Sequence, residues 1–397
     1  MNKKISVGAA VMLMLMTAAV AVTITMIFSM KMINKNLTDF SARESMFKKL
    51  ADVDAKVRER YVGKIDETKL EDELINGYMK GISDKYGTYL DAEDYKKIET
   101  DIQGKGIGIG VNVIENAEGY INVVSVVKKS PAEAAGVLAG DVIVKIGSED
   151  VKALGYASAV NLLKGDAGTK AEFTVKRNGV EKPFSIVRKQ FESQSVESRM
   201  IGNLAYVRIL EFDSNTDEQF SAQVDNLVKK GAKGIVFDVR NNPGGLLDTV
   251  EKMIDKLVPA GPVVRAKYKT GSISTLYRSD AAQISLPMAV LTNQNTASAA
   301  ELFTAALKDY GKAKSIGTKT YGKGTMQTIF DLNDGTALDL SIAYFYPPKS
   351  NNFEGKGVTP DIEVDLSSAK LSRFYQLSDQ EDDQLQAGLN YVKTLIQ

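Results

Sequence analysis

The sequence predicts an α/β protein with an inserted β-rich domain, a helical amino-terminal region and one transmembrane helix at the amino terminus. Three observations support this fold class. Strand-like and helical stretches alternate over residues 191–370, which is typical of α/β layers. Residues 96–190 hold mainly short β-rich runs separated by glycine turns. Residues 5–30 carry no charged side chain.

The apolar amino-terminal segment is flanked by lysines on both sides. Residues 5–30, as a helix, would reach about 39 Å, enough to cross a bilayer core of about 30 Å. The small residues Ala19 and Ala21 also suit cleavage of a signal peptide, but apolar sequence continues well beyond them. We therefore expect residues 1–34 to be a cytoplasmic tail and an uncleaved signal anchor at a bacterial-type cell membrane, with the following domains outside the cytoplasm. Secretion after cleavage is the alternative.

Residues 35–95 have a charged, helical pattern. Apolar side chains recur at steps of three or four residues from Phe47 to Tyr61, which places them on one helix face. A second helix is expected to run through residues 70–79 and to end around residues 84–87. The apolar face suits either an arm that binds a second copy or partner, or a cap on the next domain.

The β-rich domain opens with closely spaced glycines, Gly106, Gly108 and Gly110. Their spacing differs from that of dinucleotide-binding loops, and a strand follows where such loops lead into a helix. Glycines before a strand can instead expose backbone N–H groups to a carboxylate, and a bound peptide would then add as an extra strand.

The α/β region and the tail follow a regular order. The expected strands are residues 204–209, 234–239 and 287–291, and the expected helices are residues 216–230, 246–257 and 299–310. Asn333-Asp334-Gly335 predicts a hairpin turn between two later strands. Residues 371–397 predict an amphipathic helical tail.

The composition excludes several kinds of chemistry. The chain has no His and no Cys, so it has no Ser-His-Asp triad, no thiol nucleophile and no disulfide. Its 50 basic and 50 acidic residues balance, which argues against a nucleic-acid partner. A near match to the phosphate-binding P-loop ends in Gly324, where Ser or Thr is required. A partial calcium-loop pattern has Ile342 in place of the ligating Glu. We expect no cofactor and no metal.

Ser298 lies between an expected strand and the start of an expected helix. The first N–H groups of a helix and the positive end of its dipole can stabilise an oxyanion, which suits a nucleophile. Glu301, three residues on, also makes Ser298 a helix cap in a capping box. Taken alone, the pattern favours the cap.

Lys323 lies between two glycines, with Tyr321 and Met326 nearby in the sequence. An apolar setting lowers the pKa of a lysine, and a neutral lysine can accept the proton of a serine hydroxyl. Gln327 lies four residues on and could orient the amine. The alternative is an ordinary solvated turn residue.

A strand-to-helix turn follows Asp238 and contains Asn-Pro-Gly-Gly. Such a turn can direct the N–H groups of Gly244 and Gly245 into a cleft beyond the strand ends. The alternative is a tight turn in which Arg240 pairs with Asp238.

Four motifs together resemble the carboxyl-terminal processing protease family, and the resemblance spans residues 45–366. They are residues 238–245, 296–301, 320–327 and 355–361, in the order found in that family. The resemblance implies a crotonase-like serine endopeptidase core over residues 191–370. It implies Ser298 as nucleophile, Lys323 as general base, Gln327 as the residue that positions Lys323, and an oxyanion hole at Gly244, Gly245 and Ala299.

The resemblance also implies that residues 96–190 form a PDZ domain that captures the C-terminal ends of substrates. Its carboxylate loop would be Gly106, Ile107, Gly108 and Ile109. The family usually has Arg where this chain has Lys164, a position that in some members couples peptide binding to the active site. The implied substrates are partly unfolded proteins or apolar C-terminal tails.

Two alternatives to a protease are weighed. A non-catalytic PDZ-type scaffold would bind C-termini without cleaving them. An acyl-CoA enzyme of crotonase type would use paired acidic side chains, which the sequence does not put near Ser298. The helical arm and the tail are candidate homodimer contacts.

Overall fold

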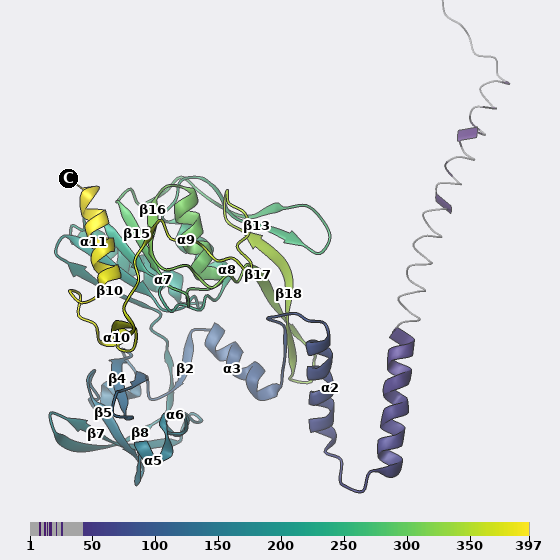
Figure 1. Cartoon of the computed structure of the whole chain (residues 1–397), viewed down its shortest axis with the longest axis horizontal. Coiled ribbons are helices and arrows are strands. Elements are labelled where there is room, and N and C mark those ends of the chain that lie inside the picture. The colour runs from purple at the N-terminus through teal and green to yellow at the C-terminus, as the bar shows by residue number, and fades with distance from the viewer. Residues whose placement is uncertain are drawn as a thin grey trace, which may run out of the picture. The chain divides into compact units, whose positions relative to one another are not determined.

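The computed structural model describes residues 8, 12, 14, 16, 17, 21, 25 and 26 and the continuous stretch 43–396. The chain divides into two compact units, residues 1–73 and residues 74–397 (Figure 1). Most of the expected transmembrane segment lies outside the described residues. Among the helices that are described, none is both long and apolar enough to cross a bilayer.

The first unit contains a helix over residues 43–60, within the region for which the sequence predicts one. Its apolar face is solvent-exposed, with Phe47 60% and Val53 51% accessible. Helix α2 (Glu67–Gly81) begins in this unit and extends into the second.

The β-rich domain has a hydrophobic core of its own, which includes Ile121, Ile143 and Val175. Its sheet has the order β3-β4-β5-β7-β8, with β6 paired to β5. Its strands are β3 (Val111–Glu115), β4 (Ile121–Val126), β5 (Val142–Ile146), β6 (Glu149–Asp150), β7 (Lys170–Arg177) and β8 (Val180–Val187). Its helices are α4 (Pro131–Ala135), α5 (Val151–Leu154) and α6 (Tyr156–Leu163). The entering strand β2 (Lys105–Gly108) and the leaving strand β9 (Lys189–Glu192) pair antiparallel.

The α/β core is built on a six-stranded sheet of order β10-β11-β12-β15-β16-β19. All neighbours pair in parallel except β10 with β11. The strands are β10 (Val196–Ile201), β11 (Leu204–Ile209), β12 (Ile235–Asp238), β15 (Met288–Thr292), β16 (Ala313–Gly317) and β19 (Ile362–Glu363). The central strands β12 and β15 are buried at every residue, as expected for parallel strands covered on both faces.

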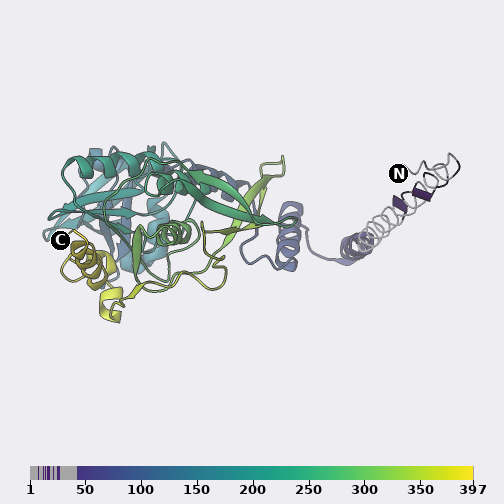
Figure 2. The ribbon, with the colours of Figure 1, turned by 90° about the horizontal axis from the view of Figure 1, so that it is seen from above.

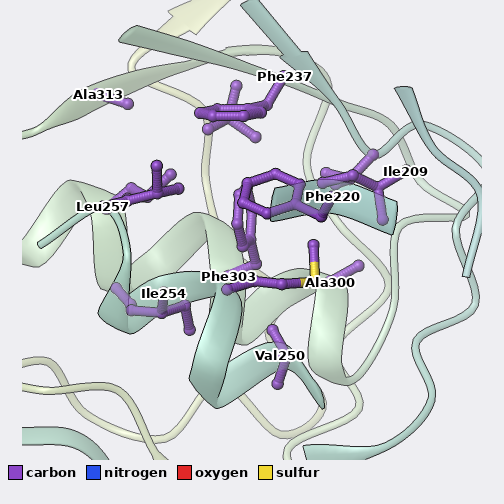
Figure 3. Packing of buried hydrophobic residues seen from close by; sticks show 14 of the residues in the cluster. Ile209, Phe220, Phe237, Val250, Ile254, Leu257, Ala300, Phe303 and Ala313 are labelled. Carbon is purple, nitrogen blue, oxygen red and sulfur yellow. The ribbon is translucent and has the colours of Figure 1, made fainter. Parts of the chain in front are cut away.

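One face of this sheet packs against α7 (Thr216–Lys229), α8 (Leu247–Asp255) and α9 (Ala299–Asp309). Phe303 of α9 lies at the centre of the contact, with its ring edge-on to Phe220 and Phe237 (Figure 3). The other face is covered by α11 (Asp383–Thr394), yellow in Figures 1 and 2. Leu389 of α11 is 2% exposed.

A second, antiparallel sheet has the order β1-β18-β13-β14, with β17 paired to β18. Its strands are β1 (Thr88–Leu90), β13 (Gly261–Tyr268), β14 (Ser274–Ser279), β17 (Thr325–Asp331) and β18 (Ala337–Tyr346). The expected turn at Asn333-Asp334-Gly335 joins β17 to β18, with positive φ at Asn333 and Gly335. The remaining elements are α3 (Ala92–Ile102), α10 (Ser368–Leu371) and a short 3₁₀ turn, Phe374–Gln376.

Candidate active site

Neighbouring strands of the parallel sheet end at the loops that carry the candidate residues. Strands β12 and β15 pair in parallel, so the turn after Asp238 and the loop before Ser298 leave the same edge of the sheet. A cleft of about 470 Å³ lies at this edge. It is lined by six of the residues that the sequence singles out: Gly244, Gly245, Ser298, Ala299, Lys323 and Gln327.

Ser298 has a strained backbone. Its φ of 54° and ψ of −118° are unusual for a residue with a side chain. Such conformations cost roughly 1–3 kcal/mol and cluster at functional sites. Gly244 packs against it, and a Cβ added to Gly244 would lie 2.8 Å from the Ser298 Cβ. Ser298 is also the residue before α9, and Glu301 accepts its backbone N–H, which is the Glu301 half of a capping box.

The fully buried carboxylate of Glu301 ties the Ser298 loop to the Lys323 loop. Its Oε2 accepts the backbone N–H groups of Ser298 (2.9 Å) and Lys323 (2.8 Å). Its Oε1 accepts the N–H of Gly322 (2.7 Å) and the hydroxyl of Thr320 (2.5 Å). Burial raises the pKa of Glu301, while these four donors favour its ionised form. The capping-box residue therefore fixes two loops that lie far apart in the sequence.

Lys323 is partly buried, and its Nζ donates a hydrogen bond to Gln327 Oε1. Burial lowers the pKa of Lys323 below its ordinary value, although the carboxylates of Asp339, Glu354 and Asp84 act in the opposite direction. The aromatic neighbour differs from the expected one. The ring of Tyr86 lies 4.8 Å from the Lys323 Nζ. The side chain of Tyr321 is instead 51% exposed.

Gln327 is held by residues that the sequence did not single out. Its Nε2 donates to the backbone carbonyl of Tyr86 (2.8 Å) and to Asp339 Oδ2 (2.8 Å). Asp339 lies within the otherwise largely apolar strand β18, and an acidic residue there is the one sequence signal that marks it. Tyr86 comes from the loop after α2, more than 200 positions away in the chain, and nothing local in the sequence predicts this contact.

The three candidate oxyanion-hole N–H groups differ in their partners. Gly244 N donates to Asn242 Oδ1 at 2.8 Å. The N–H groups of Gly245 and Ala299 have no acceptor in the part of the chain that the structure describes. Buried Asn242 also donates to the carbonyl of Ile209 (2.9 Å), which holds the turn in place.

The alternative reading of the Asp238 turn also holds. Arg240 pairs with Asp238 at 2.6 Å and, in addition, with Asp382 at 2.7 Å, the residue that precedes α11. Burial would raise the pKa of Asp238, but the Arg240 guanidinium outweighs it and holds that pKa below its ordinary range. The turn is therefore both an ion-paired structural element and a wall of the cleft.

The expected carboxylate loop of the β-rich domain is partly strand. Gly106, Ile107 and Gly108 belong to β2 and pair with β9, so only Ile109 and Gly110 form the loop before β3. The side chain of Ile109 is buried. Repeated glycines in the sequence do not distinguish a loop from a short paired strand.

Lys164 ends α6 as its C-cap residue. Its charge acts on Asp101, which lines the cleft: burial raises the pKa of Asp101, and Lys97 and Lys164 oppose that rise.

Comparison with known proteins agrees with this architecture. Residues 203–364 match the sequence profile of peptidase family S41, and residues 106–187 match that of the PDZ domain. The carboxy-terminal processing protease CtpA of Bacillus subtilis is 35% identical over 335 residues, which cover 83% of this chain and 72% of that protein. The carboxy-terminal-processing protease of Bartonella bacilliformis is 35% identical over 349 residues, which cover 84% and 79% respectively.

A solved structure of similar architecture is the photosystem II D1 C-terminal processing protease. It matches with a TM-score of 0.50 at 27% identity, over 83% of this chain and 91% of that one. The profile match, the relatives and the structure point to one family. The chain belongs to peptidase family S41 and is a PDZ-containing serine-type endopeptidase of the carboxy-terminal processing protease type.

Proposed function

We propose that the chain hydrolyses peptide bonds with Ser298 as nucleophile and Lys323 as general base. The observation that carries this proposal is the meeting, in one cleft, of a strained serine and a lysine whose pKa burial lowers. No histidine exists in the chain to serve as the base. A serine peptidase needs a nucleophile with a base beside it, whereas a purely binding scaffold would not.

The proposed reaction begins with neutral Lys323. One of its N–H groups donates to Gln327 Oε1, which leaves the nitrogen lone pair available for the Ser298 proton. Ser298 Oγ then attacks the scissile carbonyl carbon. The developing oxyanion accepts hydrogen bonds from the N–H groups of Gly245 and Ala299, which have no other acceptor among the described residues.

Collapse of this intermediate breaks the peptide bond. Protonated Lys323 returns its proton to the leaving amine, and the acyl group stays on Ser298. Water then attacks the ester with Lys323 acting as base once more. The bond between the acyl group and Ser298 Oγ breaks, and protonated Lys323 returns its proton to Ser298 Oγ. We assign the oxyanion hole to the N–H groups of Gly245 and Ala299, because the N–H of Gly244 already donates to Asn242 Oδ1.

We propose that substrates are unstructured chains with apolar C-terminal ends. Strand β3 lies at the edge of its sheet, beside α6, where Tyr156 bonds the Val113 carbonyl at 3.2 Å. An open strand edge can pair with an extended peptide. Apolar side chains, among them Phe212, Met326 and Phe345, line the cleft beside Ser298 and suit an apolar substrate residue.

The membrane anchor remains our proposal from sequence alone, carried by the uncharged residues 5–30. We propose that the full chain stays in the membrane fraction after alkaline extraction. A form that lacks residues 1–34 should be soluble.

We also propose a homodimer, based on the exposed apolar face of residues 43–60. Sedimentation of the form that lacks residues 1–34 should then give the mass of two chains.

Two substitutions test the catalytic pair. Ser298→Ala and Lys323→Ala should each lower cleavage of an unstructured protein by at least about 10³-fold, because the nucleophile and its base act as a unit. Circular dichroism should show an intact fold for both. Lys319→Ala, an exposed lysine four positions earlier, should cleave like the wild type. Normal cleavage by either cleft variant would refute the pair.

The same assay should depend on pH in one direction. Only neutral Lys323 is active, so kcat/KM should rise with pH through the lowered pKa of Lys323 and then level off. A flat profile between about pH 5 and 9 would contradict a lysine base. No histidine titration can account for a rising limb, because the chain has none.

A further inference from the structure

The side-chain amide of Gln327 has two ends of nearly equal shape but opposite hydrogen-bonding character. Lys323 needs the oxygen end, because its amine must donate a hydrogen bond while keeping its lone pair for Ser298. The two groups at the other end, the Tyr86 carbonyl and Asp339 Oδ2, accept hydrogen bonds. Turning the amide over would therefore set an oxygen against two acceptors.

Asp339 is the charged member of this pair, and its two carboxylate oxygens differ in their partners. Its Oδ2 accepts from Gln327, while its buried Oδ1 has no hydrogen-bond partner in the described part of the chain. Burial, together with the charge of Asp84, raises the pKa of Asp339, whereas the charge of Lys323 and a hydrogen bond from the Leu340 backbone act against that rise. Asp339 and Lys323 both line the cleft.

The other acidic groups that face Lys323 are occupied by other donors. Glu354, after β18, accepts from Gly324 N (2.6 Å) and the Tyr86 hydroxyl (3.1 Å). Asp84, after α2, accepts from both the backbone N–H and the hydroxyl of Ser341, each at 2.9 Å. Asp339 is thus the acidic group near Lys323 whose charge is least compensated by hydrogen bonds.

We propose that Asp339 is a positioning residue of the cleavage reaction: its carboxylate fixes the Gln327 amide with the oxygen toward Lys323 and keeps a negative charge beside the amine. This inference rests on the proposed Ser298–Lys323 pair. It divides into an orientation role and a charge role, which two substitutions separate.

Asp339→Asn removes the charge and keeps an acceptor. Its amide oxygen can still bond Gln327, while its nitrogen replaces the oxygen atom that has no partner. Asp339→Leu, of similar size, removes both charge and acceptor. In the pH profile of kcat/KM, the rising limb should move to lower pH in both variants, because the Asp339 charge raises the pKa of Lys323.

At pH values on the plateau of this profile, kcat should distinguish the two variants. Asp339→Asn should keep kcat within a few-fold of the wild type. Asp339→Leu should lower kcat roughly 10- to 100-fold with little change in KM, since the Gln327 amide loses its charged anchor. Asp334→Asn, in the exposed turn of the same hairpin, is the matched control and should change neither quantity. If Asp339→Leu does not fold, Asp339→Ala takes its place.

A measurement independent of activity separates this inference from the proposed function. In Ser298→Ala protein with ¹³Cε-labelled lysine, the Lys323 resonance is the one that Lys323→Arg removes. Its titration midpoint should fall when Asp339→Asn is added. An unchanged midpoint overturns the charge role, and equal plateaus for the Asn and Leu variants overturn the orientation role. If Ser298→Ala or Lys323→Ala protein still cleaved normally, the proposed function would fail, whereas the midpoint would still decide the charge role.

Discussion

Glu301 serves two purposes at once, and both follow from the chemistry of a carboxylate with two oxygens. Oε2 accepts the backbone N–H groups of Ser298 and Lys323, and Oε1 accepts the backbone N–H of Gly322 and the hydroxyl of Thr320. An ionised carboxylate satisfies all four donors, whereas an amide cannot, because one end is itself a donor. The distance between the Ser298 loop and the Lys323 loop therefore depends on one buried charge.

Glu301→Gln should consequently impair both catalysis and folding. Whichever way the new amide turns, one pair of donors meets an NH₂ group, at a cost of roughly 1–3 kcal/mol for each lost bond. The resulting shift of a loop should lower kcat about 10- to 100-fold. Steady-state kinetics and urea unfolding measure the two effects. Glu363→Gln, an exposed position in β19, is the control. A stability loss with wild-type kcat would assign Glu301 a structural role alone.

The individual site residues differ in how far the sequence predicts them. Ser298 and Lys323 belong to motifs whose neighbours, a helix start and a pair of glycines, carry a local physical meaning. Asp339 and Tyr86 acquire their contacts only when β18 and the loop after α2 come together, so the only local signal is the acidic side chain of Asp339 in a largely apolar strand. Proximity in the sequence predicts Tyr321 and Met326 as the neighbours of Lys323. Met326 lines the cleft with Lys323, and the aromatic ring beside the amine is that of Tyr86.

Among the elements, α11 illustrates how the tail reaches the cleft wall. Its apolar residues Leu385, Leu389 and Val392 cover one face of the parallel sheet. Asp382, just before it, caps the helix through Leu385 N (3.0 Å) and pairs with Arg240. Arg240 in turn pairs with Asp238 at the end of β12. The tail thereby stabilises the turn that carries Gly244 and Gly245.

Removing Arg240 should be costly because it leaves two buried carboxylates without a counter-charge. Arg240→Leu should lower the free energy of unfolding by roughly 3–5 kcal/mol. Asp382→Asn keeps a helix cap and should cost less, about 1–3 kcal/mol. Urea unfolding of both single variants and the double variant gives their coupling. Additive effects would indicate that the Arg240–Asp382 pair contributes nothing of its own.

The sequence predicts the central α/β elements well because these segments follow clear periodicities. The expected strand over residues 204–209 corresponds to β11, and the expected helix over residues 216–230 to α7. The sequence does not predict strands β13 and β14. The pairing of β13 with β14 is interrupted by register shifts, so no regular alternation of apolar and polar residues marks these strands in the sequence. Their formation depends on the strands that they pair with.

At the scale of the molecule, the PDZ domain and the peptidase core have separate hydrophobic cores. The hydrophobic clusters of the core contain no residue between 105 and 192, and the PDZ cluster contains none outside that range. Strands β2 and β9 bring Lys105 opposite Glu192. The ends of the inserted domain are thus adjacent, which is the geometry that tolerates insertion or removal of a domain.

Excision of the domain should therefore leave a folded core that has lost substrate capture. Replacing residues 106–191 with a short Gly-Ser linker should preserve a single cooperative unfolding transition of the core. In the Ser298→Ala background, the excised protein should bind a labelled peptide with a free apolar C-terminus at least about tenfold more weakly than the full chain, measured by fluorescence anisotropy. The same peptide with an amidated end serves as control and should bind the full chain weakly, because the proposed site recognises the carboxylate through backbone N–H groups. Undiminished binding after excision would instead assign capture to the apolar walls of the cleft beside Ser298.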